Sequence, residues 1–149
     1  MKEKAYQQDQ QMSIALSCSN RQSDSPYLPG GTITGVHGRW RGRVKDSGHD
    51  KLGRWSYQSL LGKNGRFLTV ISVYRPCSGG ESSGDTTIAY QQKMDLIDAN
   101  RSKENPREAV LKDLKDFILK LHGKKHSIVV IGDMNEDTTD ESNRIARFL

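Results

Sequence analysis

One run of apolar residues constrains the fold of this chain more than any other. Residues 128–131 are Ile-Val-Val-Ile, all β-branched and uninterrupted by a polar position. Such a run is typical of a strand that is buried on both faces of an α/β sheet. Gly132 ends the run, and Asp133 and Asn135 follow it. Because residues two apart in an extended chain point the same way, we expect a carboxylate and a carboxamide to face one cleft at the end of this strand.

Asp133 and Asn135 are suited to chemistry at phosphorus. A carboxylate can activate water or bind a metal ion, and an amide can orient water or phosphate without adding charge. The alternative is a strand that ends in an ordinary turn, for which Gly, Asp and Asn are common residues. An EF-hand does not fit, because Thr138 and Arg144 stand where glycine and glutamate are required. A P-loop NTPase does not fit either, since the chain contains no G-x-x-x-x-G-K-[ST] motif.

Several short motifs of the chain resemble those of one superfamily. Residues 132–135 (Gly-Asp-Met-Asn) are similar to the G-D-x-N motif of the endonuclease/exonuclease/phosphatase superfamily, the deoxyribonuclease-I-like phosphodiesterases. Residues 74–76 (Tyr-Arg-Pro) end an earlier apolar strand, as the Y-x-P segment does in that family. Residues 30–32 (Gly-Gly-Thr) open a strand earlier still, in the family's order. Residues 53–57 and 89–92 add a likeness to retroelement-type endonuclease domains, so the resemblance extends from residue 30 to the end of the sequence.

The resemblance implies a fold, a reaction and a set of site residues. The fold would be an α/β (α+β) sandwich with a mixed, largely antiparallel sheet and helices packed outside it. The reaction would be hydrolysis of a phosphodiester, with DNA as substrate and Mg²⁺ or Mn²⁺ as cofactor. Asp133 would position or deprotonate the water and help to hold the metal, while Asn135 and Tyr74 would orient that carboxylate and the phosphate. For Tyr74, a half-buried aromatic at the sheet edge is the alternative.

Two parts of the family's pattern have no counterpart in the sequence. The family's metal-binding glutamate follows an early apolar strand, and no acidic residue in the polar residues 1–29 does so. Its closing Ser-Asp-His segment would lie beyond Leu149. We therefore expect residues 1–29 to be a partly disordered lead-in, and residues 30–149 to be the central part of an incomplete domain with impaired activity. The alternatives are a non-catalytic nucleic-acid-binding module and a phosphatase acting on a small or lipid phosphoester.

A second pattern alternates basic residues with other residues between positions 32 and 45. One parity holds a histidine and four basic residues: His37, Arg39, Arg41, Arg43 and Lys45. The other parity holds Trp40 among glycines and valines. A single strand over this range would place the basic groups on one face, where they could follow a nucleic-acid backbone, and Trp40 on the core side. A solvated strand face without a ligand is the alternative.

The charge distribution also favours an anionic partner. The formal net charge is +5, and residues 30–75 carry nine Lys or Arg against two Asp, a net of +7. Positive charge concentrated in one segment suits phosphate binding. DNA is therefore the expected partner, through Arg39, Arg41 and Arg43. Arg75 could add a contact to a phosphate oxygen, and a salt bridge with a nearby acidic loop is its alternative.

The remaining elements follow from turn and helix signals. Strands and loops are expected at four ranges: 13–18 (strand), 46–53 (loop), 54–74 (a hairpin closed by Asn64-Gly65) and 77–85 (loop). Helices are expected at three: 87–99, 106–121 and 142–149. Asn105 suits the N-cap of the second helix. Its apolar stripe, typical of packing against a sheet, comprises Val110, Leu111, Leu114, Phe117, Ile118 and Leu121.

Composition gives an expectation for the cellular location of the protein. Apolar residues make up 34% of it, the mean hydropathy is −0.74, and no apolar run approaches the ~20 residues needed to cross a bilayer. The polar start lacks the apolar centre of a signal peptide. We expect an intracellular protein, nuclear or cytoplasmic, without a membrane partner, and with the rest of a larger polyprotein or a complementing chain as a further partner. Cys18 and Cys77 are expected to be free thiols, with one disulfide as the alternative.

Overall fold

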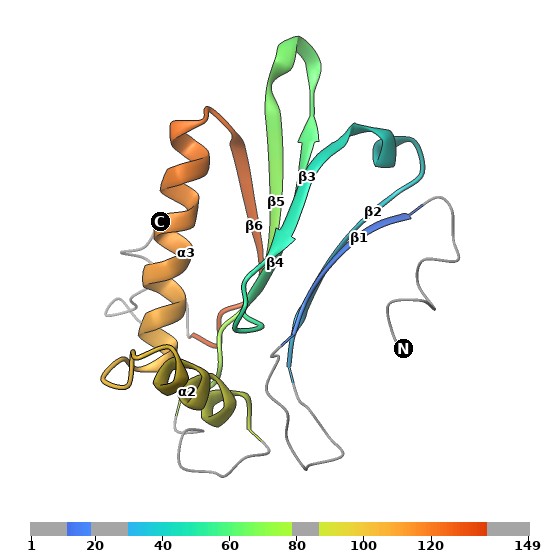
Figure 1. Cartoon of the computed structure of the whole chain (residues 1–149). Helices are drawn as coiled ribbons and strands as arrows, with labels where there is room; N and C mark the ends of the chain where they lie inside the picture. Colours follow the sequence, from blue (N-terminus) through green and yellow to red (C-terminus); the bar gives the residue numbers. More distant parts are fainter. Residues whose placement is uncertain (1–11, 19–29, 79–86, 137–149) are drawn as a thin grey trace.

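The computed structural model describes residues 12–18, 30–78 and 87–136 of the chain (Figure 1). Two strands, β1 (Met12–Ser17) and β2 (Thr32–His37), pair antiparallel in a small sheet. A larger sheet has the order β3 (Val44–His49), β4 (Trp55–Leu61), β5 (Phe67–Tyr74) and β6 (Ser127–Asp133). Its pairs are antiparallel except β5 with β6, which are parallel. The helices are α2 (Ile88–Asp98) and α3 (Pro106–Gly123), and two short 3₁₀ segments are η1 (Gly38–Arg43) and η2 (Lys63–Gly65).

The larger sheet lies between the small sheet and α3, so the described chain has three layers (Figure 1). Polar side chains join the two sheets. The Thr34 hydroxyl lies 3.0 Å from the Ser56 carbonyl oxygen, and the buried Gln58 amide donates to the carbonyl oxygens of Ser13 and Thr34 at 2.7 and 2.9 Å. The chain is therefore a mixed α/β protein with a mostly antiparallel sheet, and this coarse part of the predicted fold class is confirmed.

The α3 helix forms where its sequence signals predict it. The Asn105 side chain accepts a hydrogen bond from the Arg107 backbone N–H at 2.9 Å, and Pro106 occupies the first turn. Val110 and Leu114 on the apolar stripe are fully buried, and the Phe117 ring lies 4.9 Å from that of Tyr57. Since burying a side chain of this size contributes about 1.5–3 kcal/mol, the stripe is the main attachment of α3 to the sheet.

The hairpin of β4 and β5 is also confirmed. Asn64 and Gly65 both have positive φ, 59° and 71°, as a tight turn between antiparallel strands requires. The Gly62 N–H donates to the Arg66 carbonyl oxygen at 2.7 Å and closes the turn. The predicted strand over 13–18 and the helix over 87–99 appear as β1 and α2.

The predicted single strand over residues 32–45 is wrong. β2 ends at His37, and the chain then forms η1 before β3 begins at Val44. Gly38 has φ +62°, a conformation that ends an extended strand and that glycine adopts without strain. Trp40 is consequently 50% exposed instead of facing the core. The predicted loop over 46–53 is wrong in its first half, because residues up to His49 belong to β3.

The prediction that residues 128–131 are buried on both faces is wrong as well. Ile128 and Val130 pack against the core beneath α3, but Val129 and Ile131 are 43% and 52% exposed. The small sheet packs over β3, β4 and β5, and in the described residues β6 pairs only with β5. Among the described elements, α3 covers one face of β6 and no layer covers the other.

Some predictions concern residues outside the described ranges. These are the lead-in over 1–11 and 19–29, most of the predicted loop over 77–85, and the helix over 142–149. Neither helix of the described residues is long and apolar enough to cross a membrane.

Candidate functional site

The parallel pairing of β5 and β6 brings Tyr74 and Asp133 to the same edge of the sheet, where they stand side by side in register. The Arg75 N–H donates to the Asp133 carbonyl oxygen at 2.9 Å and continues the pairing by one residue. Gly132 makes this approach possible. A Cβ atom there would lie 1.8 Å from the Val73 carbonyl oxygen, and its φ of +149° is rare for other residues.

Asn135 is held between the ends of the two strands. Its backbone N–H donates to Asp133 Oδ1 at 2.9 Å, and its φ of 47° folds the chain back toward β5. Its side-chain amide donates to the Arg75 carbonyl oxygen at 2.6 Å, and its Oδ1 accepts from Cys77 Sγ at 3.1 Å. These bonds fix the carboxamide and orient one oxygen of the exposed Asp133 carboxylate. Asp133 and Asn135 are thus neighbours, but through a backbone turn after β6 and not through extended residues that point the same way, and their sharing of a cleft stays a prediction.

Tyr74 completes the predicted group. Its side chain is half-buried. Burial raises the pKa of the Tyr74 hydroxyl, the neighbouring Cys77 raises it further, and a hydrogen bond with Asn135 acts in the opposite direction. The hydroxyl is therefore protonated at neutral pH and can donate a hydrogen bond to an anion. The structure brings together Tyr74, Asp133 and Asn135, while their roles stay predictions.

Arg75 lies beneath this site, with a side chain only 1% exposed. It pairs with Glu136 through Nη1 and donates from Nε to the Arg107 carbonyl oxygen at 3.1 Å. Arg107 binds the same Glu136 carboxylate and donates to the Asn135 carbonyl oxygen at 3.1 Å. Burial, followed by the charge of Arg107, lowers the pKa of Arg75. Of the two predicted alternatives for Arg75, the structure shows the salt bridge with an acidic loop.

Sequence reasoning missed Glu136, Arg107 and Cys77 as neighbours of this site. Glu136 directly follows the Gly-Asp-Met-Asn motif, so its closeness in sequence was a usable signal. Arg107 lies in the first turn of α3, and only the packing of that helix brings it near the end of β6. Cys77 is exposed and, like Cys18, is a free thiol, so the prediction of free cysteines is confirmed.

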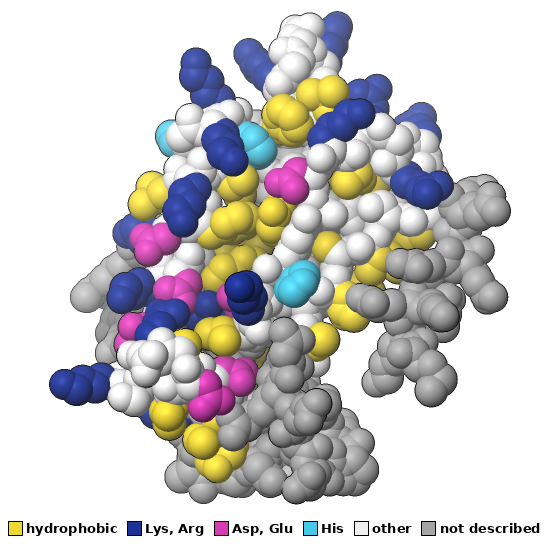
Figure 2. Space-filling view, in the orientation of Figure 1, with side chains coloured by type: hydrophobic (Ala, Val, Ile, Leu, Met, Phe, Trp, Pro, Cys, Tyr) yellow, Lys and Arg dark blue, Asp and Glu magenta, His cyan; other side chains and the backbone are white. Residues whose placement is uncertain are grey.

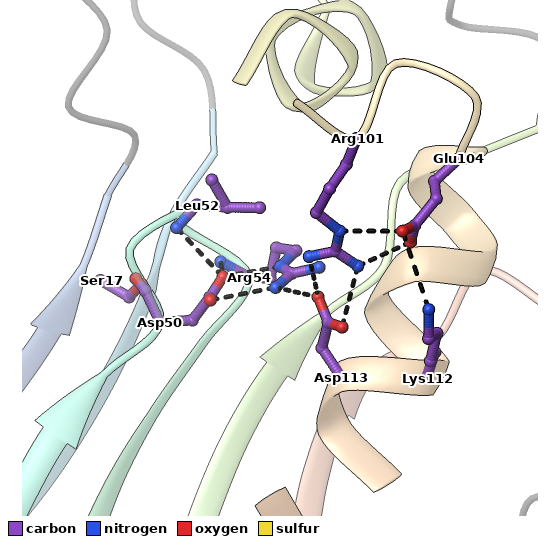
Figure 3. A network of polar contacts seen from close by, with 8 residues as sticks. All are labelled: Ser17, Asp50, Leu52, Arg54, Arg101, Glu104, Lys112 and Asp113. Atoms are coloured by element: carbon purple, nitrogen blue, oxygen red, sulfur yellow. Dashed lines mark hydrogen bonds and ion pairs between the residues drawn. The ribbon is translucent and has the colours of Figure 1, made fainter. Parts of the chain in front are cut away.

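A second polar network holds α3 and the α2–α3 connection against the sheet near the same end (Figure 3). Arg54, 3% exposed, contacts Asp50 at 2.7 Å and Asp113 at 2.8 Å. Arg101 contacts Asp113 at 2.7 Å and Glu104 at 2.6 Å. Each carboxylate here accepts from an arginine, so the charges at this end of the molecule are largely neutralised locally.

The three arginines predicted to bind nucleic acid lie elsewhere. The strand register places Val44, at the start of β3, in the same row across the sheet as Ser127, at the start of β6, through the partners Leu60 and Leu68. Asp133 is the last residue of β6, six residues farther along, which corresponds to about 20 Å at 3.3 Å per residue. The η1 segment, which carries Arg39, Arg41 and Arg43, immediately precedes Val44. The structure therefore separates these arginines from Asp133 along the length of the sheet.

The described residues do not fit a metal site by themselves. No three His, Cys, Asp or Glu side chains gather as metal ligands in residues 12–18, 30–78 and 87–136. At the candidate site Asp133 is exposed, whereas the Glu136 carboxylate is engaged by Arg75 and Arg107. Mg²⁺ binds through one or two carboxylates together with waters and substrate phosphates, so Asp133 would be the one protein ligand of such an ion among the described residues.

Comparisons of the chain with protein-family models, with curated proteins and with solved structures found no match. The mixed α/β fold is what the structure shows. The deoxyribonuclease-I-like assignment continues to rest on the sequence motifs and stays a prediction.

Proposed function

We propose that this chain carries the phosphodiester site of a metal-dependent nucleic-acid hydrolase that acts on DNA. One observation carries the proposal: parallel β5 and β6 bring Tyr74, Asp133 and Asn135 together at the carboxyl ends of both strands. Ligands of α/β sheets bind at this edge. The three residues combine a base, an amide and a hydroxyl donor, which are the groups that hydrolysis at phosphorus requires.

In this proposal each residue has a separate role. The exposed Asp133 carboxylate accepts a proton from the attacking water, while the Asn135 N–H holds one of its oxygens at 2.9 Å. The protonated Tyr74 hydroxyl donates a hydrogen bond to a phosphate oxygen. Asn135, fixed by the Arg75 carbonyl group, keeps the carboxylate and the hydroxyl in place. Mg²⁺ or Mn²⁺ would offset the charge on the phosphate oxygens, and because the described residues offer this ion one exposed carboxylate, we expect weak binding of the metal and a low rate.

The test is nicking of supercoiled plasmid with Mg²⁺ by wild type, Asp133→Asn and Asp116→Asn. Asp116 is an exposed carboxylate on α3, so its substitution removes the same charge away from the site. We expect weak metal-dependent nicking by wild type and Asp116→Asn, and none by Asp133→Asn. Equal nicking by Asp133→Asn, or no nicking by any of the three proteins, would contradict the proposed hydrolase.

A non-catalytic nucleic-acid-binding module is the second candidate. The observation that favours it is that Asp133 is the one exposed carboxylate of the site among the described residues, with a basic segment about 20 Å farther along the sheet. It requires DNA binding that is equal in wild type and Asp133→Asn while neither nicks. DNA binding that is absent from both proteins would reject this candidate.

A further inference from the structure

The end of the larger sheet farthest from Asp133 concentrates positive charge. This hairpin end, defined as residues 38–46, 61–68 and 119–127, surrounds the β4–β5 turn and the last turn of α3. Its nine basic residues are all exposed: Arg39, Arg41, Arg43, Lys45, Lys63, Arg66, Lys120, Lys124 and Lys125. In Figure 2, Lys and Arg side chains line this part of the molecule, at the top of the view.

The two ends of the sheet differ in how their charge is compensated. Near Asp133, arginines alternate with carboxylates, as in the contacts of Arg54 and Arg101 with Asp113. At the hairpin end the acidic residue within the defined ranges is Asp46, whose carboxylate accepts from the Tyr57 hydroxyl at 3.3 Å. Within these described ranges nine basic residues stand against one acidic residue, an excess of positive charge that attracts polyanions.

The Trp40 ring holds two of these basic side chains, Arg39 and Arg43, in place. The guanidinium carbons of Arg39 and Arg43 lie 5.4 and 5.7 Å from the centroid of the Trp40 ring, within the range of cation–π attraction. Arg43 also donates to the Leu61 carbonyl oxygen at 3.3 Å, which ties η1 to the hairpin. The two guanidinium groups are thus held in place before a ligand arrives, and their planar forks match phosphate oxygens.

We propose that the hairpin end is a docking surface for the phosphate backbone of a nucleic acid, separate from the Asp133 site. The basic residues lie on or beside η1, η2 and the last turn of α3, so their charge is spread over three elements, which an extended polyanion covers better than a mononucleotide. A duplex of about six base pairs spans the ~20 Å between the two ends of the sheet. The choice of nucleic acid over another polyanion rests on the proposed function.

The test is the salt dependence of binding to a fluorescent DNA duplex about two helical turns long. The variant Arg39→Gln/Arg41→Gln/Arg43→Gln is compared with Lys51→Gln/Lys103→Gln/Lys115→Gln, which loses the same charge at exposed positions outside the hairpin end. Each lost phosphate contact lowers the slope of log K against log salt by about 0.9, so we expect a decrease of about 2 to 3 in the arginine variant. The lysine variant should keep the wild-type slope.

Two results would overturn the proposal. One is an equal loss of binding in both triple variants, which would assign the binding to net charge alone. The other is binding to phosphatidylserine vesicles as tight as binding to DNA at the same salt concentration, which would point to a membrane surface. Asp133→Asn is measured in parallel, and its binding should equal that of wild type. Absence of nicking would therefore leave the test of the docking surface unaffected. Absence of salt-dependent binding would likewise leave the nicking test of the Asp133 site unaffected.

Tryptophan fluorescence gives an independent readout at this surface. Trp40 is 50% exposed, while Trp55, the other tryptophan, is 6% exposed and lies against Phe117. Addition of DNA should quench the emission of wild type, and Trp40→Phe should lose this change while it still binds DNA. Quenching that is unchanged in Trp40→Phe would place the nucleic acid elsewhere.

Discussion

At the scale of single residues, the candidate site depends on backbone geometry as much as on acid–base groups. Gly132 lets β6 run directly beside β5, and Asn135 turns the chain so that its amide reaches the Arg75 carbonyl oxygen. Asp133 is placed by these two neighbours and not by packing of its own side chain, which is exposed. The glycine of the Gly-Asp-Met-Asn motif is therefore a structural requirement for the position of the aspartate.

Gly132→Ala tests this requirement. A Cβ atom at 1.8 Å from a carbonyl oxygen forces the strands apart, and we expect a loss of at least about 2 kcal/mol in the free energy of unfolding. The measurement is the urea midpoint of wild type and variant. Gly42→Ala is the control, because no atom lies within 4 Å of its added Cβ. Equal midpoints for the two variants would show that Gly132 is not needed for the pairing.

At the scale of elements, α3 is attached to the sheet by an apolar stripe and by a polar network at its first half. Asp113 projects from α3 and accepts from both Arg54, which directly precedes β4, and Arg101 of the α2–α3 connection. A helix with only an apolar stripe could slide along the sheet. The carboxylate between two fixed guanidinium groups sets the position of the helix, and hence that of Arg107 near the candidate site.

The network makes a prediction about pH. Burial raises the pKa of Asp113, but the hydrogen bonds from Arg101 and Arg54 outweigh it and bring the pKa below the ordinary 3.8. The folded state therefore keeps Asp113 ionised to lower pH than the unfolded chain does. Its stabilising contribution is present above pH 3.8 and is lost as the pH falls below that value.

We expect Asp113→Asn to be less stable than wild type at neutral pH, and to show a flatter dependence of stability on pH between about 4 and 2. The measurement is the urea midpoint as a function of pH. Asp116→Asn, also on α3 but exposed, should follow the wild-type curve. A parallel curve for Asp113→Asn would show that the network does not contribute in this way.

At the scale of the whole molecule, the arrangement of layers decides which residues of a strand are buried. The α3 helix covers one face of the larger sheet, and the small sheet covers part of the other. β6 lies under α3 but beyond the small sheet, so its side chains alternate between packed and exposed. The molecule also separates its charges, with neutralised networks near Asp133 and an excess of exposed basic residues over acidic ones at the hairpin end.

Two isoleucines of β6 test the layer arrangement with the same chemical change. Ile128→Ala removes a side chain that packs under α3, and we expect it to cost about 2 kcal/mol. Ile131→Ala removes a side chain that is 52% exposed, and we expect it to cost less than about 1 kcal/mol. The urea midpoints of the two variants give the comparison. Equal costs would mean that a further layer covers the second face of β6 in solution.

Local sequence signals by themselves determined the elements whose formation depends on a few adjacent residues. Asn64-Gly65 predicted the hairpin, and Asn105-Pro106 predicted the start of α3. These outcomes follow from turn geometry and capping, which are properties of neighbouring residues.

Only the tertiary structure decided how far the strands extend, which faces are covered and which charges are paired. The alternation around Trp40 fits a strand, but a positive φ at Gly38 and the pairing of β3 with β4 produce a 3₁₀ segment instead. The apolar run of β6 fits full burial, yet in the part of the chain that the structure describes no layer covers its second face. Arg75 is buried because Glu136 and Arg107, distant in sequence, meet it there. Burial and ion pairing are set by such long-range contacts, which single-sequence patterns do not encode.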